Sequence, residues 1–320
     1  MTFYTYKFTA TIVVFLTFFL LVPKSDASTL PLPLPFPLPL PHPLPPLPQS
    51  DVGLLEFSLN LEYQEAEFFL HGALGFGLDV VAPGLSGGGP PPIGARKANL
   101  DPLTRDIILQ FGYQEVGNLR AIKRTVTGFP RPLLNLSTEI FASGIDRAFG
   151  RPLIPPFDPY ANTINYLLAS YIFPYVGLTE YVGANPNLQS STSKQLVAGL
   201  LGTKSGQDAV IREYLYERAA LEVHPYGITV AEFTNRISEL GNRLARAGLK
   251  HEGLVVPPSN GADGKVAGNV LSGDQNSLSY ARTPEETLRI LYLTGDEHGP
   301  GGFFPGGADG RIARSYYQKA

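Results

Sequence analysis

Hydrophobic residues recur at helical spacing over four long segments of the chain, and turn residues separate these segments. The first segment starts at Asp51, a residue suited to cap a helix, and ends at the glycines that begin with Gly72. The second starts with Asp101 as a capping residue and Pro102 in the first turn, and it ends at about Thr127. Both segments are predicted to be long helices.

The third and fourth segments are also predicted to be helices. The third covers roughly residues 160–182 and contains Pro174, which must kink the helix or divide it. Its many aromatic residues would suit a strand, but it is too long, because strands rarely exceed about ten residues. The fourth covers about residues 193–223, and His224 with Pro225 ends it.

Two shorter helices, at about residues 229–247 and from Thr283, complete the predicted elements. The last one begins with a capping box of Thr283 and Glu286 around a first-turn proline. Glycines and prolines near the C-terminus argue against an independent core there. We therefore expect an all-α chain in which residues 51–224 form a four-helix bundle and residues 225–320, with long loops, pack on it.

The N-terminal residues 1–27 have the pattern of a signal peptide. The basic residue Lys7 precedes fifteen apolar residues, and small residues lead up to Ala27, where cleavage is expected. A spanning helix needs roughly 20 apolar residues, so no membrane anchor is expected after cleavage. The chain is predicted to be secreted to the extracellular space, apoplast or cell wall, and the sequon at Asn135 is then a predicted glycosylation site.

Residues 28–50 are predicted to be a linker in which proline alternates with leucine. Proline at this density favours polyproline II, which forms a semi-rigid spacer. The same segment could contact the cell wall or another protein, but a spacer is the simpler interpretation.

The overall composition excludes several classes of function. The chain has 25 basic and 28 acidic side chains and no block of like charge, so a nucleic-acid partner is not expected. It contains no cysteine, which rules out disulfides, thiolate metal sites and a cysteine nucleophile.

The second long helix places polar residues among its apolar positions. Phe111, Glu115, Asn118 and Ile122 follow one another at steps of four, three and four residues. This spacing puts Glu115 and Asn118 on the apolar stripe of the helix and away from its solvated side.

Two other long helices each carry a glutamate on the predicted inner face. Glu62 lies seven residues before Phe69, and Glu180 lies seven residues after Phe173. A solvated helix face is the ordinary location of any single glutamate, because ionised carboxylates are rarely buried without a partner. Three inward glutamates would repel one another, so we expect a metal, protons or a basic side chain to neutralise them.

The segments LNLEYQEAEFFL, FGYQEVGNLRAI and LLGTKSGQDAVIREYLYERA resemble the plant desiccation-related proteins of the PCC13-62 type, in the ferritin-like superfamily. The resemblance extends from about residue 51 to the C-terminus, and it implies a ferritin-like four-helix bundle with additional C-terminal helices. In metal-binding members of this superfamily, the first and third helices each offer a glutamate, while the second and fourth each offer Glu-x-x-His.

The resemblance also implies where metal ligands would lie in this chain. Three positions keep a carboxylate: Glu62, Glu115 and Glu180. Asn118 stands where the histidine of the second helix belongs, while Lys204 and Gln207 stand where the glutamate and histidine of the fourth helix belong. The resemblance therefore implies a degenerate di-metal site.

These replacements disfavour a metal. The amide oxygens of Asn118 and Gln207 are weak, neutral ligands, and the ammonium of Lys204 brings positive charge to the place a cation would occupy. None of the five histidines lies at a ligand position. We expect Lys204 to neutralise the buried glutamates while Asn118 and Gln207 supply hydrogen bonds, and we expect no cofactor.

Three hypotheses for the function follow. The first is a secreted, non-catalytic desiccation-related protein with a structural, protective or binding role in stress or seed drying, a context that the resemblance alone supplies. The second is a carboxylate-bridged iron-binding protein or di-iron oxidase with a reduced ligand set. The third is a cell-wall or carbohydrate-binding protein, prompted by 16 tyrosines, 19 phenylalanines and the proline tract, although aromatic residues at helical spacing usually form core. The lost ligands favour the first hypothesis.

Overall fold

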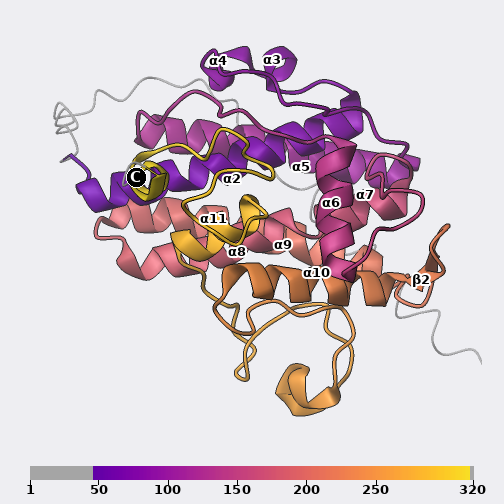
Figure 1. The fold of residues 1–320 in the computed structure, drawn as a ribbon. Helices are drawn as coiled ribbons and strands as arrows, with labels where there is room; N and C mark the ends of the chain where they lie inside the picture. Colours follow the sequence, from indigo (N-terminus) through magenta and orange to yellow (C-terminus); the bar gives the residue numbers. More distant parts are fainter. Residues whose placement is uncertain (1–45, 318–320) are drawn as a thin grey trace, which may run out of the picture. The chain divides into compact units, whose positions relative to one another are not determined.

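The computed structural model describes residues 46–317, and helices are its main elements (Figure 1). The predicted signal peptide at residues 1–27 and most of the predicted linker at residues 28–50 lie outside the described residues. None of the helices in the described part of the chain has the length and apolar character needed to cross a membrane.

Four helices form the bundle: α2 (Gln49–Leu74), α5 (Pro102–Thr125), α8 (Phe173–Ala184) and α9 (Ser191–Tyr216). The most extensive contacts join α2 to α5 and α8 to α9, so the bundle consists of two helix pairs. Gly112 allows α5 to approach α2 closely, because a Cβ atom at this position would lie 2.9 Å from the side chain of Leu70. The all-α four-helix architecture predicted from the sequence is confirmed.

The third bundle helix is divided at Pro174, as predicted. Helix α7 (Thr163–Ser170) precedes the break, and α8 begins again with Pro174 in its first turn. Proline is well accommodated there, because first-turn N–H groups have no partner within the helix.

The cap predicted for the second helix is confirmed, and the cap predicted for the first is wrong. The side chain of Asp101 accepts a hydrogen bond from the backbone N–H of Thr104 at 3.0 Å, which begins α5. Asp51 lies inside α2, where its carboxylate accepts hydrogen bonds from the N–H groups of Gln189 and Ser190, both at 2.9 Å. Asp51 therefore ties α2 to the start of α9 and does not cap its own helix.

The predicted end of the fourth helix is also wrong. Helix α9 ends at Tyr216, and residues that were predicted to continue it form a small antiparallel hairpin of β1 (Glu222–Val223) and β2 (Ile228–Thr229). The side chain of Val223 is buried against the rest of the fold. This packing stabilises the hairpin more than the helix that the sequence pattern predicted here.

The remaining elements surround the bundle. They are α3 (Leu78–Val81), α4 (Pro83–Ser86), α6 (Thr138–Phe149), α10 (Val230–Ala245), α11 (Pro284–Leu291), α12 (Arg311–Tyr317) and the short 3-10 helices η1 (Asn185–Asn187), η2 (Pro258–Asn260) and η3 (Ala262–Gly264). Helix α10 contacts α6, α9 and α11, and α12 packs on α2. Helix α6 was not predicted, because the prolines before it suggested an irregular stretch.

Only half of the predicted capping box forms at α11. The hydroxyl of Thr283 accepts a hydrogen bond from the N–H of Glu286 at 3.4 Å. The carboxylate of Glu286 instead accepts hydrogen bonds from Lys250 Nζ, at 2.9 and 2.8 Å. The ion pair with Lys250 thus replaces the reciprocal bond of the box.

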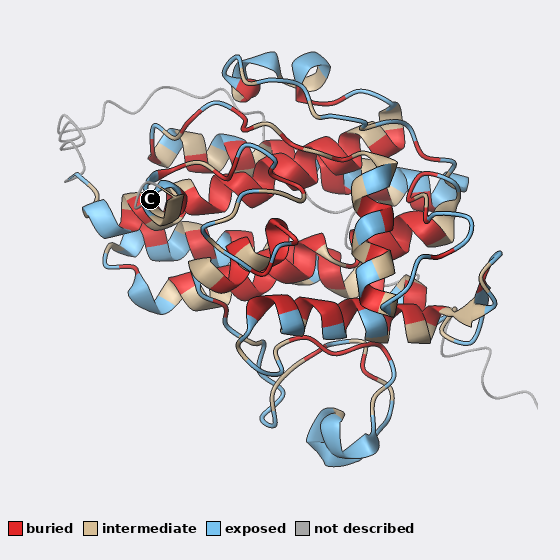
Figure 2. Cartoon of the chain, in the orientation of Figure 1, coloured by how far each residue is buried: buried red, intermediate tan, exposed pale blue. Residues whose placement is uncertain are grey.

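Helix α2 is enclosed by other parts of the fold along most of its length. Every residue from 57 to 70 is buried, including the polar ones, and Figure 2 shows this as an almost continuous red stretch. Because the helix is surrounded by α5, α8, α9 and α12, it has no solvated face in this range. Hydrophobic periodicity therefore carries little information about which of its residues meet at the bundle centre.

Arg212 attaches the loop-rich stretch before α11 to the bundle helix α9. Its buried guanidinium donates hydrogen bonds to the carbonyl oxygens of Asn269 at 2.7 Å and Val270 at 2.6 Å. It also reaches the carbonyl oxygens of Glu252 at 3.2 Å and Gly253 at 3.3 Å. These backbone groups gain strong, charge-assisted partners without a regular secondary structure.

Candidate functional site in the bundle centre

Lys204 of α9 lies in the bundle centre and contacts three carboxylates. Its Nζ atom is 3.3 Å from Glu62 Oε2 and 2.9 Å from Glu65 Oε2, and it also donates a hydrogen bond to Glu115 Oε2. All four side chains are fully buried. The structure thus brings together Lys204 with two of the glutamates expected from the sequence, and adds a third from α2.

The amide side chains of Gln207 and Asn118, at the positions where the resemblance implies histidines, act as hydrogen-bond donors to Glu115. Gln207 Nε2 donates to Glu115 Oε1 at 2.6 Å and to Gln114 Oε1 at 3.1 Å. Asn118 Nδ2 lies 3.3 Å from Glu115 Oε2. Glu115 therefore accepts hydrogen bonds from an ammonium and from two amides, and these stabilise its charged form.

Glu180 is the predicted carboxylate that forms no ion pair with Lys204. The hydroxyl of Ser58 lies 3.3 and 3.2 Å from the two carboxylate oxygens of Glu180. The neighbouring residue Tyr181 reaches the cluster instead, because its hydroxyl donates a hydrogen bond to Glu62 Oε1 at 2.5 Å.

Glu65 is the cluster residue that sequence reasoning missed. It lies three residues after Glu62, so the two side chains project from neighbouring positions of α2. Gly177 of α8 leaves room for it, since a Cβ atom there would lie 3.2 Å from Glu65 Oε1. The three-residue spacing between Glu62 and Glu65 was the available sequence signal. It did not identify Glu65 as a site residue, because glutamates on the solvated side of an ordinary helix often have the same spacing.

The four groups at the centre neutralise one another. Burial raises the pKa of Glu65 to about 8 and raises the pKa of Glu62 well above its ordinary value, although Lys204 opposes both shifts. Burial also acts on Glu115, but there Lys204 and the hydrogen bonds outweigh it and hold the pKa below its ordinary value. The pKa of Lys204 is raised, because the carboxylates outweigh its burial. The surroundings therefore favour the charged forms of Lys204 and Glu115 as an ion pair, and burial favours the protonated forms of Glu62 and Glu65.

Replacing Glu180 by glutamine is expected to make stability less dependent on pH. Burial raises the pKa of Glu180 to about 8, and the hydrogen bond from Ser58 opposes this only in part. The folded chain then keeps a proton between pH 4.5 and 8 that the unfolded chain releases, so the parent loses stability as pH rises through this range. One pKa unit corresponds to about 1.4 kcal/mol, so the effect amounts to a few kcal/mol at most.

Urea unfolding of the parent and the Glu180→Gln variant at pH 5 and pH 8 measures this effect. The variant should gain stability relative to the parent as the pH rises. Glu213→Gln, which changes an exposed glutamate of α9, is the matched control and should leave the pH dependence unchanged. A Glu180→Gln variant that follows the parent at both pH values would show that Glu180 is ionised in the folded chain.

The residues of the centre do not fit a di-iron group. The ammonium of Lys204 lies among the carboxylates that would bind the cations, and it carries no lone pair to offer a metal. No imidazole of residues 46–317 joins the cluster, and Asn118 and Gln207 stand where the resemblance implies histidines. Two imidazoles and a carboxylate are therefore missing from the expected ligand set.

The partly buried His71 and the buried His251 are engaged elsewhere. His71 Nδ1 lies 3.2 Å from Glu67 Oε2, in a separate cluster in which Arg131 pairs with Glu67 and Asp79. The ring of His251 stacks on the ring of Tyr175 at a centroid distance of 4.0 Å. Neither imidazole is available to a metal at the bundle centre.

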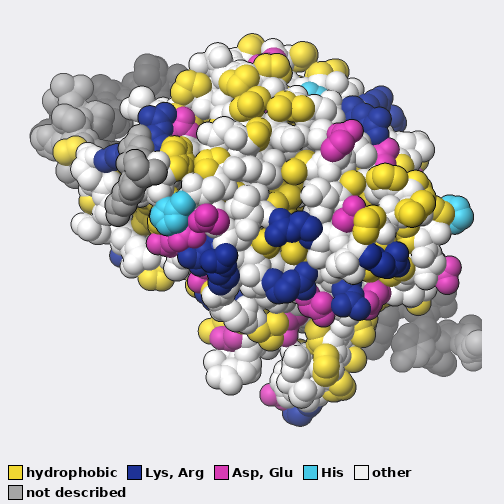
Figure 3. All heavy atoms as spheres, viewed as in Figure 1, with side chains coloured by type: hydrophobic (Ala, Val, Ile, Leu, Met, Phe, Trp, Pro, Cys, Tyr) yellow, Lys and Arg dark blue, Asp and Glu magenta, His cyan; other side chains and the backbone are white. Residues whose placement is uncertain are grey.

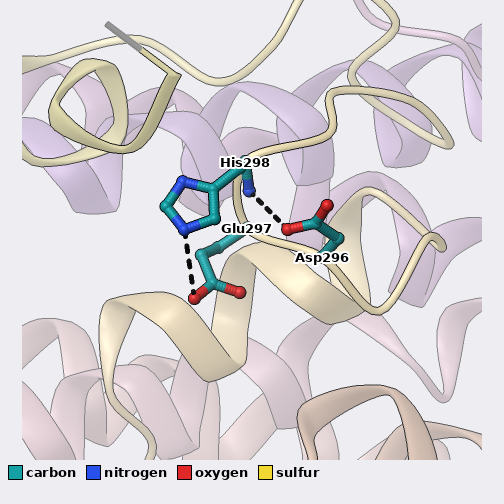
Figure 4. Close-up of side chains that lie close together, drawn as sticks. All are labelled: Asp296, Glu297 and His298. Carbon is teal, nitrogen blue, oxygen red and sulfur yellow. Dashed lines mark hydrogen bonds and ion pairs between the residues drawn. The ribbon is translucent and has the colours of Figure 1, made fainter. Parts of the chain in front are cut away.

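A second group of possible ligands lies on the surface at Asp296, Glu297 and His298 (Figure 4). Arg289 holds both carboxylate oxygens of Glu297, at 2.6 and 2.8 Å, and this pairing lowers the pKa of Glu297 to about 2. His298 Nδ1 lies 2.6 Å from the carbonyl oxygen of Tyr316. These side chains already have partners within the chain, so the group is a structural turn.

A bundle of four helices with carboxylates gathered at its centre is the architecture of ferritin-like proteins. Residues 50–217 match the family model described as a ferritin-like domain. The chain therefore belongs to the ferritin-like family and, within it, to the plant desiccation-related proteins of the PCC13-62 type.

Two relatives show how far this similarity extends. The chain is 59% identical over 265 residues to the desiccation-related protein PCC13-62 of Craterostigma plantagineum, covering 83% of this chain and 85% of the relative. It is 61% identical over 268 residues to the ferritin-like catalase Nec2 of Nesocodon mauritianus, covering 84% of this chain and 86% of the relative. No solved structure matches the chain.

Proposed function

We propose that this chain is a secreted, non-catalytic ferritin-like protein with a structural, protective or binding role in drying tissue. The observation that carries the proposal is the position of Lys204, whose ammonium is bound by three glutamates where metal-binding relatives would need free ligands. The role in drying is supported by the similarity to a relative named as desiccation-related.

The Lys204 cluster gives the bundle a neutral centre that needs no metal. In a metal-binding bundle, the cations offset the repulsion between inward carboxylates. Here the ammonium of Lys204 and the protonation that burial favours at Glu62 and Glu65 do so, and the amides of Asn118 and Gln207 add hydrogen bonds to Glu115. Folding is then independent of a metal supply, which suits a protein that acts by binding or by its own stability.

The expected location and partners follow from the whole sequence. Secretion rests on the signal-peptide pattern of residues 1–27, and the proline tract remains a proposed contact with the cell wall or with another protein. Charged side chains of both signs are mixed on the face in Figure 3, in keeping with a formal net charge of -3. This mixture supports a partner other than nucleic acid.

The name of one relative favours a second candidate function, the decomposition of hydrogen peroxide. Such an activity requires a redox group, and the ligands at the bundle centre do not fit one. The two candidates therefore make opposite predictions about metal and peroxide.

Metal analysis and peroxide assays of the purified full-length secreted protein separate these candidates. After incubation with iron(II) or manganese(II) and removal of free ions, the protein should hold less than about one metal ion per chain, because the ligand set is incomplete. It should also release no more oxygen from hydrogen peroxide than buffer does. Metal uptake together with oxygen release that a chelator abolishes would establish the second candidate instead.

A further inference from the structure

A groove runs along the outer side of the bundle between α5 and α9. Its inner cavity has a volume of about 400 Å³, within the size range of small-molecule sites. Side chains from both helices line this cavity, including Phe111, Gln114, Asn118, Thr203 and Gln207. An adjoining cavity of about 550 Å³ continues between the same helices, and both cavities share Phe111 and Val210.

Gln207, which lines the inner cavity, carries an unpaired hydrogen-bond acceptor. The residue is only 1% exposed, and its Oε1 atom has no hydrogen-bond partner among the described residues. Its Nε2 atom donates to Glu115 and Gln114, so rotating the amide would bring Oε1 against two other acceptors. A molecule that brings a donor into the groove would satisfy this buried acceptor.

The rest of the lining indicates a neutral ligand with several hydroxyl groups. Gln110, Gln114 and Asn118 follow one another at four-residue steps on α5, so their amides form a row along the groove. An amide offers both donors and an acceptor, and a hydroxyl can bond to either. Phe111 and Val210 add apolar surface between these polar groups, which suits the C–H face of a sugar ring.

The charges along the groove disfavour anionic ligands. Neither Lys nor Arg is among the described residues that line the two cavities. The carboxylates of Glu213 and Glu217 lie at the end of the groove farther from Gln207, where they would repel an acidic sugar. The lining therefore favours neutral sugars over sugar acids of the same size.

We propose that the groove between α5 and α9 binds a neutral saccharide of a few sugar units, with a hydroxyl of the ligand donating to Gln207 Oε1. This goes beyond the proposed function, and it holds whether or not the bundle centre takes up metal. The proposal rests on the lining of the groove and not on the aromatic content of the chain. Nearly all the large aromatic residues of the bundle core are buried and cannot contact a ligand.

Saturation-transfer NMR on the full chain tests the proposal with sucrose and cellobiose as neutral probes and digalacturonate as the acidic one. The neutral sugars should receive saturation, and digalacturonate should bind at least about tenfold more weakly, because its carboxylates face Glu213 and Glu217. Absence of transfer to both neutral sugars, or equal binding of the acidic one, would overturn the proposal.

Gly206→Leu is the variant that blocks the groove. Gly206 lines the inner cavity, and a Cβ atom added there meets nothing within 4 Å, so the leucine can fill the space without disturbing the fold. Gly199→Leu is the matched control, because Gly199 lies on the same helix in equally open space but lines neither cavity. Both substitutions replace a helical glycine by a better helix former.

Gly206→Leu should weaken binding of the neutral sugars at least about tenfold, as expected when a side chain fills a ligand pocket, while Gly199→Leu should bind like the parent. Equal binding by the two variants would place the sugar elsewhere and overturn the proposal. Sedimentation of the same samples provides a second check. A parent dimer that Gly206→Leu dissociates, without sugar binding, would show that a second copy of the chain occupies the groove and would likewise overturn it.

Discussion

Replacing Lys204 by methionine is expected to lower the free energy of unfolding by about 3–5 kcal/mol at pH 7. The methionine keeps much of the side-chain volume but removes the charge that stabilises ionised Glu115 in a fully buried site. Glu115 must then either remain charged without a cation or take up a proton, and both cost free energy at neutral pH. Urea unfolding followed by circular dichroism measures the loss.

Two controls separate loss of charge from loss of packing. Lys265→Met removes a lysine from an exposed pair with Asp263 and should change stability by no more than about 0.5 kcal/mol. The double variant Lys204→Met with Glu115→Gln removes both members of the ion pair, and burial without Lys204 favours the protonated forms of Glu62 and Glu65. It should therefore recover much of the lost stability. Its stability should also fall less steeply with rising pH than that of the single variant, because Glu115 no longer titrates, while Glu62, Glu65 and Glu180 still do.

These measurements can contradict the cluster in two ways. If Lys204→Met unfolds at the same urea concentration as the parent at pH 7, then Lys204 does not neutralise a buried carboxylate. If the double variant is no more stable than the single one, the loss comes from packing around the lysine stem and the ion pair contributes little.

Local sequence signals predicted those elements whose ends are determined locally. Asp101 and Pro102 act on residues only a few positions away, and the structure confirms that they mark the start of α5. Asp51 shows the limit of such signals, because it has the same capping chemistry but its acceptor oxygens serve the start of α9, more than a hundred residues away. A sequence pattern cannot distinguish a local cap from a distant one.

The same distinction applies to the bundle centre. Glu115 and Lys204 were expected to point inward because α5 and α9 each have a solvated side, which gives the apolar stripe a direction. Helix α2 has no such side around Glu65, so this residue could not be recognised by periodicity. Glu180 does lie on a buried face, but its carboxylate contacts the hydroxyl of Ser58, a partner that the sequence pattern does not reveal.

The triple variant Asn118→His, Lys204→Glu, Gln207→His is expected to bind about two iron ions per chain, the number that a ferritin-like ligand set holds. It would give α5 and α9 each a Glu-x-x-His motif with both ligands on one helix face. The carboxylates of Glu62, Glu65 and Glu115 already converge at this point, because Lys204 contacts all three. Removing the ammonium frees them for a cation, and the imidazoles supply the ligands that iron prefers over amides.

Anaerobic titration with iron(II), followed by metal analysis and thermal unfolding, measures the result. Iron bound only to the folded chain should raise its stability by about 2.7 kcal/mol for each site at a free concentration of about 100 times Kd. The double variant Asn118→His, Gln207→His is the decisive control, because it has both imidazoles but keeps Lys204 and should bind little iron. Uptake of two ions by this control would show that the ammonium moves aside readily, and that Lys204 does not by itself keep metal out of the bundle.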